Sequence, residues 1–179
     1  VAHNGDRFDL PQITARLIVH GFQPPAPYKT VDTCRISRKK FGFPSHSLEY
    51  LAKVLGCHEK LAHKKFPGFE LWLECLRGND EAWREMMEYN IQDVQTLEEV
   101  YLKMLPYIDN HPNVAVVSDK EEHSCPKCGS DHMQSRGYAY THTGKYQRFQ
   151  CQSCGGWSRT RYTENTLDKR KSLLTHQVN

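Results

Sequence analysis

The first two thirds of the chain place apolar and polar residues with the period of an α-helix. In four segments the apolar side chains recur at every third or fourth position, which puts them on one helix face. Capping residues agree with this: Ser47 precedes one segment and Gly56 follows it, and Asn79 precedes another. The last helix is expected to break near Asn90. The predicted helices span residues 10–20, 48–55, 69–76 and 80–105.

Strand-like patterns are rare in this region and dominate the end of the chain. Residues 30–33 predict one short strand, whereas the proline-rich segment 23–27 predicts a loop, because proline fits neither a helix interior nor a central strand. Beyond residue 123, apolar and polar residues alternate with period two, as in a small antiparallel sheet. The expected strands cover residues 138–142, 146–151 and 157–161.

These patterns indicate one ordinary domain followed by a small module, which is also what 179 residues allow. A composition of 38% hydrophobic and 25% charged residues is globular and excludes wholesale disorder. The expected fold class is α/β with a small β-rich module. The predicted parts are a domain over 1–108, a linker over 109–122, the module over 123–163 and a tail over 164–179.

The sequence carries no sign of export or of a membrane. It has no apolar run of about 18 residues, which a membrane-spanning helix would need, and no basic-then-apolar segment at the amino terminus. Cys34, Cys57 and Cys75 are scattered in apolar or helical contexts, which is typical of reduced core thiols. A cytoplasmic location without membrane contact is expected.

The last four cysteines form two Cys-x-x-Cys pairs separated by 22 residues, and a glycine follows each pair. Each pair places two thiolates on one tight turn, and two facing turns complete the tetrahedral sulfur site that suits Zn²⁺. A module this small buries too little apolar surface to fold alone, so a structural zinc ion would stabilise it. The alternatives, two disulfides or a redox pair, do not account for two symmetric pairs. The expected zinc ligands are Cys125, Cys128, Cys151 and Cys154.

The same module interleaves basic and aromatic residues, a combination that binds phosphates and stacks bases. Residues 118–179 hold 10 basic and 6 acidic side chains, against 14 and 15 in residues 1–117. In the alternative interpretation, the aromatic residues form the small core and the basic residues a solvated face. The expected nucleic-acid contacts are Arg148, Arg159 and Arg161, beside Arg136, Lys145, Tyr138, Tyr140, Tyr146, Phe149 and Trp157.

Two acidic motifs lie near the ends of the first domain. Asn4 is followed after three residues by Phe8-Asp9, at the start of a predicted helix. Tyr89 and Asp93 lie four residues apart in the last predicted helix, and therefore on one helix face. In the alternative interpretation, Asp9 only caps a helix, Asp93 is a solvated carboxylate and Tyr89 is a core residue.

In this order and context, the two motifs resemble the second and third motifs of the DEDD superfamily, the ribonuclease-H-like 3′–5′ exonucleases. Tyr-x-x-x-Asp is the tyrosine variant of the third motif. Residues 31–33 and 47–52 resemble the strand and helix that the family has between them, so the resemblance covers residues 1–108. The C-terminal module over residues 123–163 resembles the zinc ribbon of exonuclease-like proteins from bacteria and their viruses.

The resemblance implies a ribonuclease-H-like exonuclease fold that cleaves DNA or RNA with two Mg²⁺ or Mn²⁺ ions. Carboxylates hold such ions around one phosphate. Asp9 and Asp93 would then be metal ligands, and the hydroxyl of Tyr89 would orient the attacking water. Asn4 and Phe8 would shape the cleft and contact the terminal nucleotide.

One part of the family pattern is missing, because no Asp-x-Glu precedes Asn4. Residues 119–121 have that spacing but lie in the expected linker, without the apolar flanks of a core strand. Three explanations stay open: a longer protein, a second polypeptide that supplies the missing strands, or a relative that has lost catalysis. The two functional hypotheses are a portion of an exonuclease and an inactive nucleic-acid-binding or protein-interaction module built on a zinc ribbon.

Overall fold

The computed structural model describes residues 1–58, 65–119 and 123–175. Two compact units make up the chain, Val1–Met104 and Leu105–Asn179. The first is mainly helical and the second contains a three-stranded antiparallel sheet, so the α/β class expected from the sequence is confirmed. Within the described residues, no helix has the length and apolar character needed to cross a bilayer.

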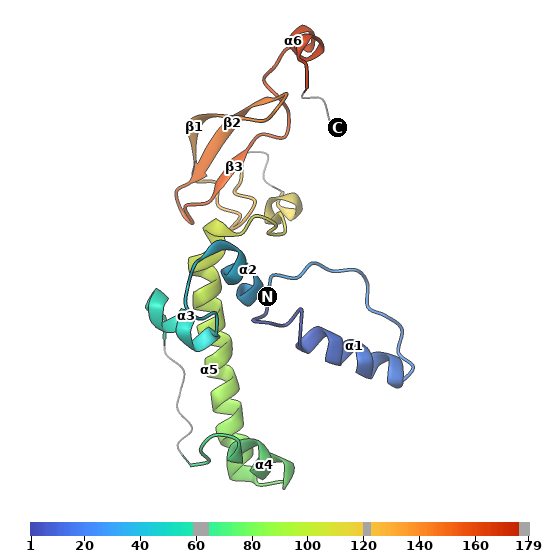
Figure 1. Ribbon diagram of the computed structural model, residues 1–179, viewed down its shortest axis with the longest axis vertical. Coiled ribbons are helices and arrows are strands. Elements are labelled where there is room, and N and C mark those ends of the chain that lie inside the picture. The colour runs from blue at the N-terminus through green and yellow to red at the C-terminus, as the bar shows by residue number, and fades with distance from the viewer. Residues whose placement is uncertain (59–64, 120–122, 176–179) are drawn as a thin grey trace. The chain divides into compact units, whose positions relative to one another are not determined.

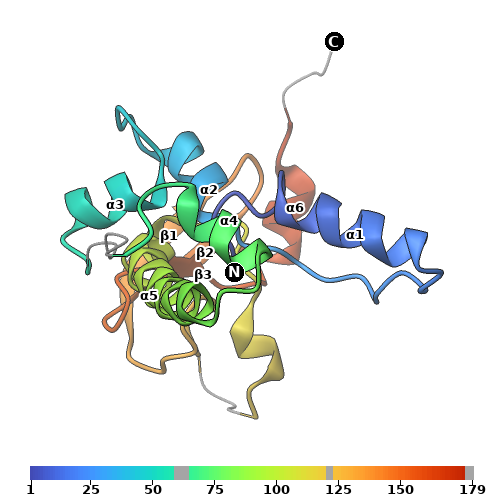
Figure 2. The ribbon, with the colours of Figure 1, turned by 90° about the horizontal axis from the view of Figure 1, so that it is seen from below.

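The long helix α5 (Asp80–Met104) is the element on which the first unit is assembled (Figure 1). The other helices are α1 (Asp9–Val19), α2 (Thr33–Lys40), α3 (Leu48–Leu55) and α4 (Glu70–Leu76). Helices α3 and α4 pack against α5 most extensively, and α2 does so over a smaller area. Helix α1 extends away from α5 in two perpendicular views (Figures 1 and 2).

Local capping determines where these helices begin and end, as the sequence predicts. The Ser47 hydroxyl accepts a hydrogen bond from the Tyr50 N–H at the start of α3. Gly56 ends the same helix in the left-handed conformation, with φ 62°. The Asn79 side chain accepts from the Glu81 N–H and so satisfies a free donor in the first turn of α5.

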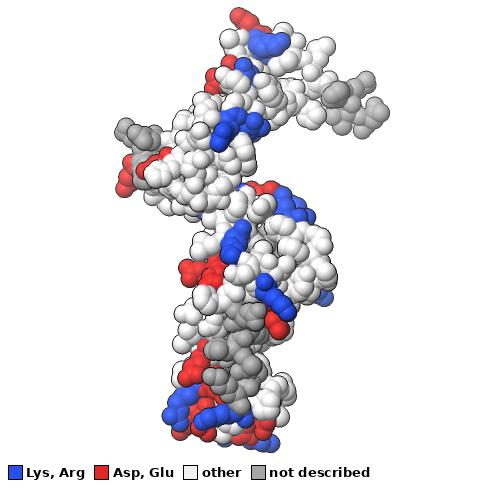
Figure 3. Space-filling model, turned by 90° about the vertical axis from the view of Figure 1, so that its left-hand side faces the viewer, with Lys and Arg blue, Asp and Glu red and all other residues white. Residues whose placement is uncertain are grey.

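Small apolar clusters among the described residues join α3 and α4 to α5. Leu51 and Ala52 of α3 are fully buried against Val100 and Met104 of α5. A second cluster joins α4 to the beginning of α5, where the exposed surface carries charges of both signs (Figure 3). Its buried members are Leu71, Cys75 and Ala82.

Asp32 ties the amino terminus to α2. Its carboxylate, only 4% exposed, accepts hydrogen bonds from four backbone N–H groups. Two of these begin α2, so Asp32 is the N-cap of that helix. The other two come from the loop that follows Ala2, which itself forms a parallel bridge with Asp32. The donors are Asn4 at 2.9 Å, Asp6 at 3.1 Å, Cys34 at 3.0 Å and Arg35 at 3.1 Å.

The structure corrects two predictions in this unit. The strand expected over residues 30–33 is reduced to the isolated bridge at Asp32, because the capping by that residue starts a helix at Thr33. The break expected near Asn90 is absent, and α5 runs through this position. Asn90 is exposed, and asparagine lowers helix stability by only about 0.5 kcal/mol relative to alanine, which the packing of α5 overrides.

The second unit is built on the strands β1 (Met133–Tyr140), β2 (Lys145–Cys151) and β3 (Trp157–Arg159). They form an antiparallel sheet with β2 in the centre. Short 3₁₀ turns at Leu105–Tyr107 and Val114–Val117 precede the sheet. Residues 120–122, which include two positions of the Asp-x-Glu triplet at 119–121, lie outside the described residues.

The tail expected over residues 164–179 contains a helix that the sequence pattern did not predict. Helix α6 (Leu167–Ser172) begins where the Thr166 hydroxyl accepts a hydrogen bond from the Lys169 N–H. The helix buries no residue, so it lacks the apolar periodicity on which the prediction depended.

Replacing Asp32 with alanine should destabilise the first unit. The substitution removes the acceptor of four backbone N–H groups and the cap of α2, and we expect the free energy of unfolding to fall by about 2–4 kcal/mol. Urea denaturation followed by circular dichroism measures the change. Asp80→Ala, at an exposed position in the first turn of α5, is the matched control. Equal effects of the two substitutions would contradict the role of Asp32.

Candidate functional site

A tight turn holds the motif that contains Asn4 and Asp9. Asn4 has φ 63°, a left-handed conformation that asparagine tolerates better than most residues. Its carbonyl accepts a hydrogen bond from the Phe8 N–H at 3.1 Å, and α1 begins at Asp9 directly afterwards. A Cβ at Gly5 would lie 2.5 Å from the Cβ of Ala2 and 3.4 Å from Asp9 Oδ2, so the turn requires glycine there. The turn therefore fixes the place of Asp9 while Phe8 stays exposed.

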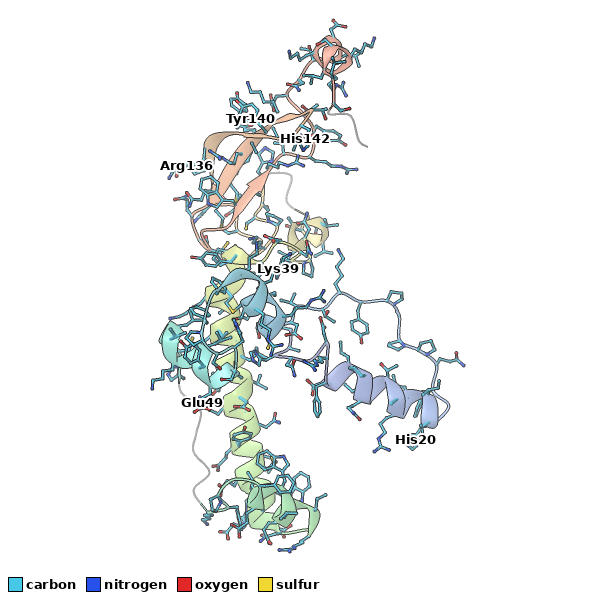
Figure 4. All side chains as sticks on the ribbon, in the orientation of Figure 1. His20, Lys39, Glu49, Arg136, Tyr140 and His142 are labelled. Carbon is cyan, nitrogen blue, oxygen red and sulfur yellow. The ribbon has the colours of Figure 1, made fainter. Side chains whose placement is uncertain are left out.

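A pocket of about 190 Å³ lies between this turn and α2. Arg35 Nη1 is 3.4 Å from Asp6 Oδ2, whereas Asp6 Oδ1 is buried and accepts no hydrogen bond from the described residues. Helix α2 is strongly basic, with Lys39 projecting from it (Figure 4). The residues that line the pocket are Asn4, Asp6, Arg7, Asp32, Cys34, Arg35 and Arg38. Three guanidinium groups at one pocket suit an anion.

Sequence reasoning missed this basic pocket, although a local signal was present. Asp32 stands directly before a segment in which four of eight residues are Arg or Lys, and an aspartate in that place is typical of a helix N-cap. That reading would have predicted a basic helix beside Asn4. The near-neutral charge of residues 1–117 as a whole concealed it.

His3 lies between the turn and the beginning of α2. Its Nδ1 is 2.8 Å from the Thr33 hydroxyl. Burial lowers the pKa of His3 below its usual value of 6.5, and Arg38 acts in the same direction, whereas Asp32 and the backbone of His46 oppose them. The imidazole is therefore neutral at pH 7 and contributes hydrogen bonding rather than charge.

Tyr89 and Asp93 occupy one face of α5, a single turn apart, as the sequence predicts. Both are half-buried. The Tyr89 ring packs edge to face against Trp72 of α4, with ring centroids 6.0 Å apart. This contact fixes the direction of the Tyr89 ring.

The structure does not gather the carboxylates of the two motifs into one cluster. Within the described residues, the only group of three or more His, Cys, Asp or Glu side chains able to share a metal is a set of four cysteines. Asp9 lies at the start of α1, which is not among the helices that pack extensively against α5. Asp9 and Asp93 are therefore too few to fit a two-metal centre by themselves.

Helix α1 has no buried residue among those described, although its sequence is amphipathic. Ile18 is 76% exposed, and Phe22 just beyond the helix is 66% exposed. An apolar hollow of about 310 Å³ runs along this face up to His20, at the end of the helix (Figure 4). The helix thus presents an apolar face of the kind that usually packs on a sheet.

The four cysteines of the second unit lie with all their Sγ atoms within 4.8 Å of one another. Sγ of Cys125 is 3.6 Å from that of Cys154, and the same distance separates Cys128 and Cys151. Disulfides would need about 2.05 Å, whereas a tetrahedral zinc ion with Zn–S bonds of about 2.3 Å places sulfurs about 3.8 Å apart. The residues present therefore fit zinc, and the geometry excludes the two disulfides considered above.

The electrostatics of these thiols also suit a bound cation. Burial raises the pKa of the Cys154 thiol to about 12, and the neighbouring Cys128 and Cys125 thiols act in the same direction. Burial acts likewise on Cys151, but hydrogen bonds with the backbone of Cys154 and Ser153 lower its pKa to about 6. Four thiolates at this spacing repel one another, and a divalent cation removes that repulsion.

The predicted nucleic-acid contacts of this unit are distributed along the sheet. Arg148 and Arg159 are exposed and lie directly opposite each other on β2 and β3. Arg161 lies beyond β3, with its guanidinium 5.6 Å from the Tyr162 ring. Phe149 is buried, so it belongs to the core of the unit rather than to its surface.

The four-cysteine cluster gives the second unit the ligand set of a small zinc ribbon, which follows a mainly helical unit. Comparison with protein families matches residues 1–105 to the RNase H superfamily, and the chain belongs to this superfamily. Searches of curated proteins and of solved structures give no match. Membership supports nuclease-type chemistry, a role for divalent metal ions and binding to nucleic acid.

Replacing Cys125 with serine should release the zinc ion and unfold the second unit. The remaining three thiolates form an incomplete site, and the metal supplies much of the stability of such a module. Elemental analysis should find about one zinc ion per chain in the parent protein and much less in the variant. The helical signal of Val1–Met104 should persist.

Cys57→Ser is the control for this substitution, because Cys57 is half-buried in the first unit and outside the cluster. It should keep its zinc. The parent protein should also lose zinc on acidification, because protons compete with the metal for the thiolates. A zinc-free parent protein, or full zinc content in Cys125→Ser, would contradict the assignment.

Proposed function

We propose that the chain is a portion of a two-metal-ion-dependent 3′–5′ exonuclease of the tyrosine variant. The observation that carries the proposal is the match to the RNase H superfamily over residues 1–105, which contain both acidic motifs in the order expected for such an enzyme. Helix α5 places Tyr89 and Asp93 on one face, and the turn after Asn4 places Asp9 at a helix start.

In this proposal, each part of the site has a separate task. Asp9 and Asp93 are the carboxylates that the chain contributes to the metal ions, which activate water and neutralise charge on the phosphate. Tyr89, held by Trp72, orients the attacking water through its hydroxyl. Asn4 and the exposed Phe8 ring contact the terminal nucleotide.

The basic pocket beside the turn supports a nucleic-acid substrate. Arg7, Arg35 and Arg38 line it, Arg7 stands two residues before Asp9, and guanidinium groups bind phosphate oxygens in pairs. A phosphate held there would lie beside the turn that leads into Asp9. The pocket does not distinguish DNA from RNA.

The proposal includes a further segment that completes the site. An Asp-x-Glu pair is needed in addition to Asp9 and Asp93, and the exposed apolar face of α1 has the character of a helix that packs on a sheet. An upstream segment or a second polypeptide with strands and this pair would supply both.

The alternative function is an inactive nucleic-acid-binding or protein-interaction module built on the zinc ribbon. The absence of a carboxylate cluster within the described residues favours it. The two functions differ in one requirement, because only the exonuclease needs Asp9 and Asp93 to bind divalent metal.

In a preparation that contains the Asp-x-Glu segment, Asp9→Ala and Asp93→Ala should each abolish Mg²⁺-dependent cleavage from 3′ ends, because each removes a metal ligand. Tyr89→Phe should slow cleavage by about 10²-fold, since it removes only an orienting hydroxyl. Release of nucleotides from an end-labelled strand measures the rates. Glu98→Ala, at an exposed position on α5, should leave them unchanged. Full activity in Asp93→Ala would refute the assignment.

The 179-residue chain alone should show no Mg²⁺-dependent exonuclease activity. Asp9 and Asp93 offer too few ligand oxygens, and Mg²⁺ dehydrates reluctantly, so it would stay hydrated and weakly held. Nucleic-acid binding should persist and weaken with salt. Mixing with a polypeptide that carries the missing strands should restore cleavage. Cleavage by the isolated chain that Asp9→Ala abolishes would show that the remaining carboxylates come from elsewhere in the sequence.

A further inference from the structure

The exposed side of the zinc-ribbon sheet carries two aromatic and two guanidinium side chains in adjacent positions. Arg148 and Arg159 are directly opposite across β2 and β3, and Gln150 and Trp157 form the next pair on the same side. Tyr146 lies two residues before Arg148 on β2, and its side chain is therefore on the same side of the sheet. We name this surface the Arg–Trp face, and its residues are Tyr146, Arg148, Gln150, Trp157 and Arg159.

The opposite side of the sheet is the core of the unit. Phe149 and Cys151 alternate with the residues of the Arg–Trp face along β2 and are buried. Trp157 is 49% exposed, and both arginines are exposed. The aromatic residues on the Arg–Trp face are therefore not needed to fill the core, which was the alternative explanation for them.

A β-bulge fixes one of the two arginines. The register between β1 and β2 shifts between Ser135 and Tyr138, so Arg136 and Gly137 together oppose Arg148. Gly137 has φ 74°, a left-handed conformation that glycine adopts without steric cost. The Arg136 carbonyl accepts hydrogen bonds from Arg148 Nε at 3.1 Å and Nη2 at 2.9 Å. The guanidinium is thus held in place before any ligand arrives.

Each guanidinium also lies over an aromatic ring of the neighbouring strand. Cζ of Arg148 is 5.0 Å from the centroid of the Trp157 ring, and Cζ of Arg159 is 3.8 Å from that of Tyr146. Such cation–π contacts orient the flat groups and leave the outer nitrogens for other partners. The result is a row of aromatic and cationic groups that crosses the two strands.

This arrangement carries an electrostatic cost. Two like charges directly opposite each other in a sheet are destabilising. The three strands contain no Asp or Glu, and neither Arg148 nor Arg159 forms an ion pair within the part of the chain that the structure describes. An anion bound between the two guanidinium groups would remove the repulsion.

We infer that the Arg–Trp face binds single-stranded nucleic acid, with phosphates on Arg148 and Arg159 and a base stacked on the exposed Trp157 ring. The inference rests on the proposed function in that it takes nucleic acid as the substrate. It specifies the form of that substrate and a second place where the chain holds it. A base in a duplex has both faces covered by its neighbours, so only an unpaired strand can place a base on Trp157.

Fluorescence anisotropy with a labelled oligothymidylate of about 12 nucleotides tests the inference. The full chain is used in its zinc-bound form in magnesium-free buffer, so that binding is measured without cleavage. Trp157→Ala should weaken binding about tenfold, and Trp157→Phe should restore most of the affinity because it keeps a stacking surface. Arg148→Gln should weaken binding and lower the salt dependence by about 0.7 per lost phosphate contact.

Two controls separate this face from general effects of charge and ring area. Tyr28 is an aromatic residue of the first unit that is 58% exposed and lines neither the basic pocket nor the Arg–Trp face. Lys171 on α6 is exposed and carries the same charge as Arg148. Tyr28→Ala and Lys171→Gln should bind like the parent protein.

Several results would overturn the inference. These are equal losses in Tyr28→Ala and Trp157→Ala, equal losses in Lys171→Gln and Arg148→Gln, or equal affinity for a duplex of the same length. Zinc content and the circular dichroism spectrum are measured for every variant, so that a loss of binding caused by unfolding is recognised. If Trp157→Ala unfolds, the affinity of Trp157→Phe tests the stacking role of this position. Because no divalent cation is added, failure of the exonuclease proposal leaves these binding results unchanged.

Discussion

The first unit depends on a single buried carboxylate. Asp32 accepts hydrogen bonds from four backbone N–H groups, two in α2 and two in the loop after Ala2. A buried charge is tolerated only when hydrogen bonds replace its hydration, and here the backbone supplies them. The same bonds hold the loop after Ala2 beside α2, so the basic pocket between them depends on this one side chain.

The second unit solves the same problem of a small core with a metal instead of a carboxylate. Its buried apolar residues are few, and four sulfurs at zinc-binding distance join the two turns that hold the sheet. A zinc ion held by these sulfurs would stabilise the fold, so the exposed side of the sheet would not have to contribute apolar packing. Trp157 and Arg148 can therefore lie on the surface. A metal-free domain of this size would need the aromatic ring in its core.

Local interactions explain what the sequence could predict. Capping by Ser47 and Asn79 and the spacing of the cysteine pairs act over a few residues, and they agree with the structure. The rest depends on contacts between distant segments. Asp32 reads as a strand residue until its partners at Asn4 and Asp6 are known. The bulge in β1 reverses the alternation of the strand, and no pattern of period two shows this. Whether Asp9 and Asp93 share a site remains a prediction for the same reason.

The turn after Asn4 also has a consequence for sequence variation. A methyl group at position 5 and the one at position 2 cannot coexist, because their carbons would be 2.5 Å apart. The two positions thus share space for one side chain, and they should vary as a pair among related proteins. A larger residue at position 5 would have to be accompanied by glycine at position 2. Covariation of these two positions would arise from the packing of two small side chains near Asp9, and not from a shared role in catalysis.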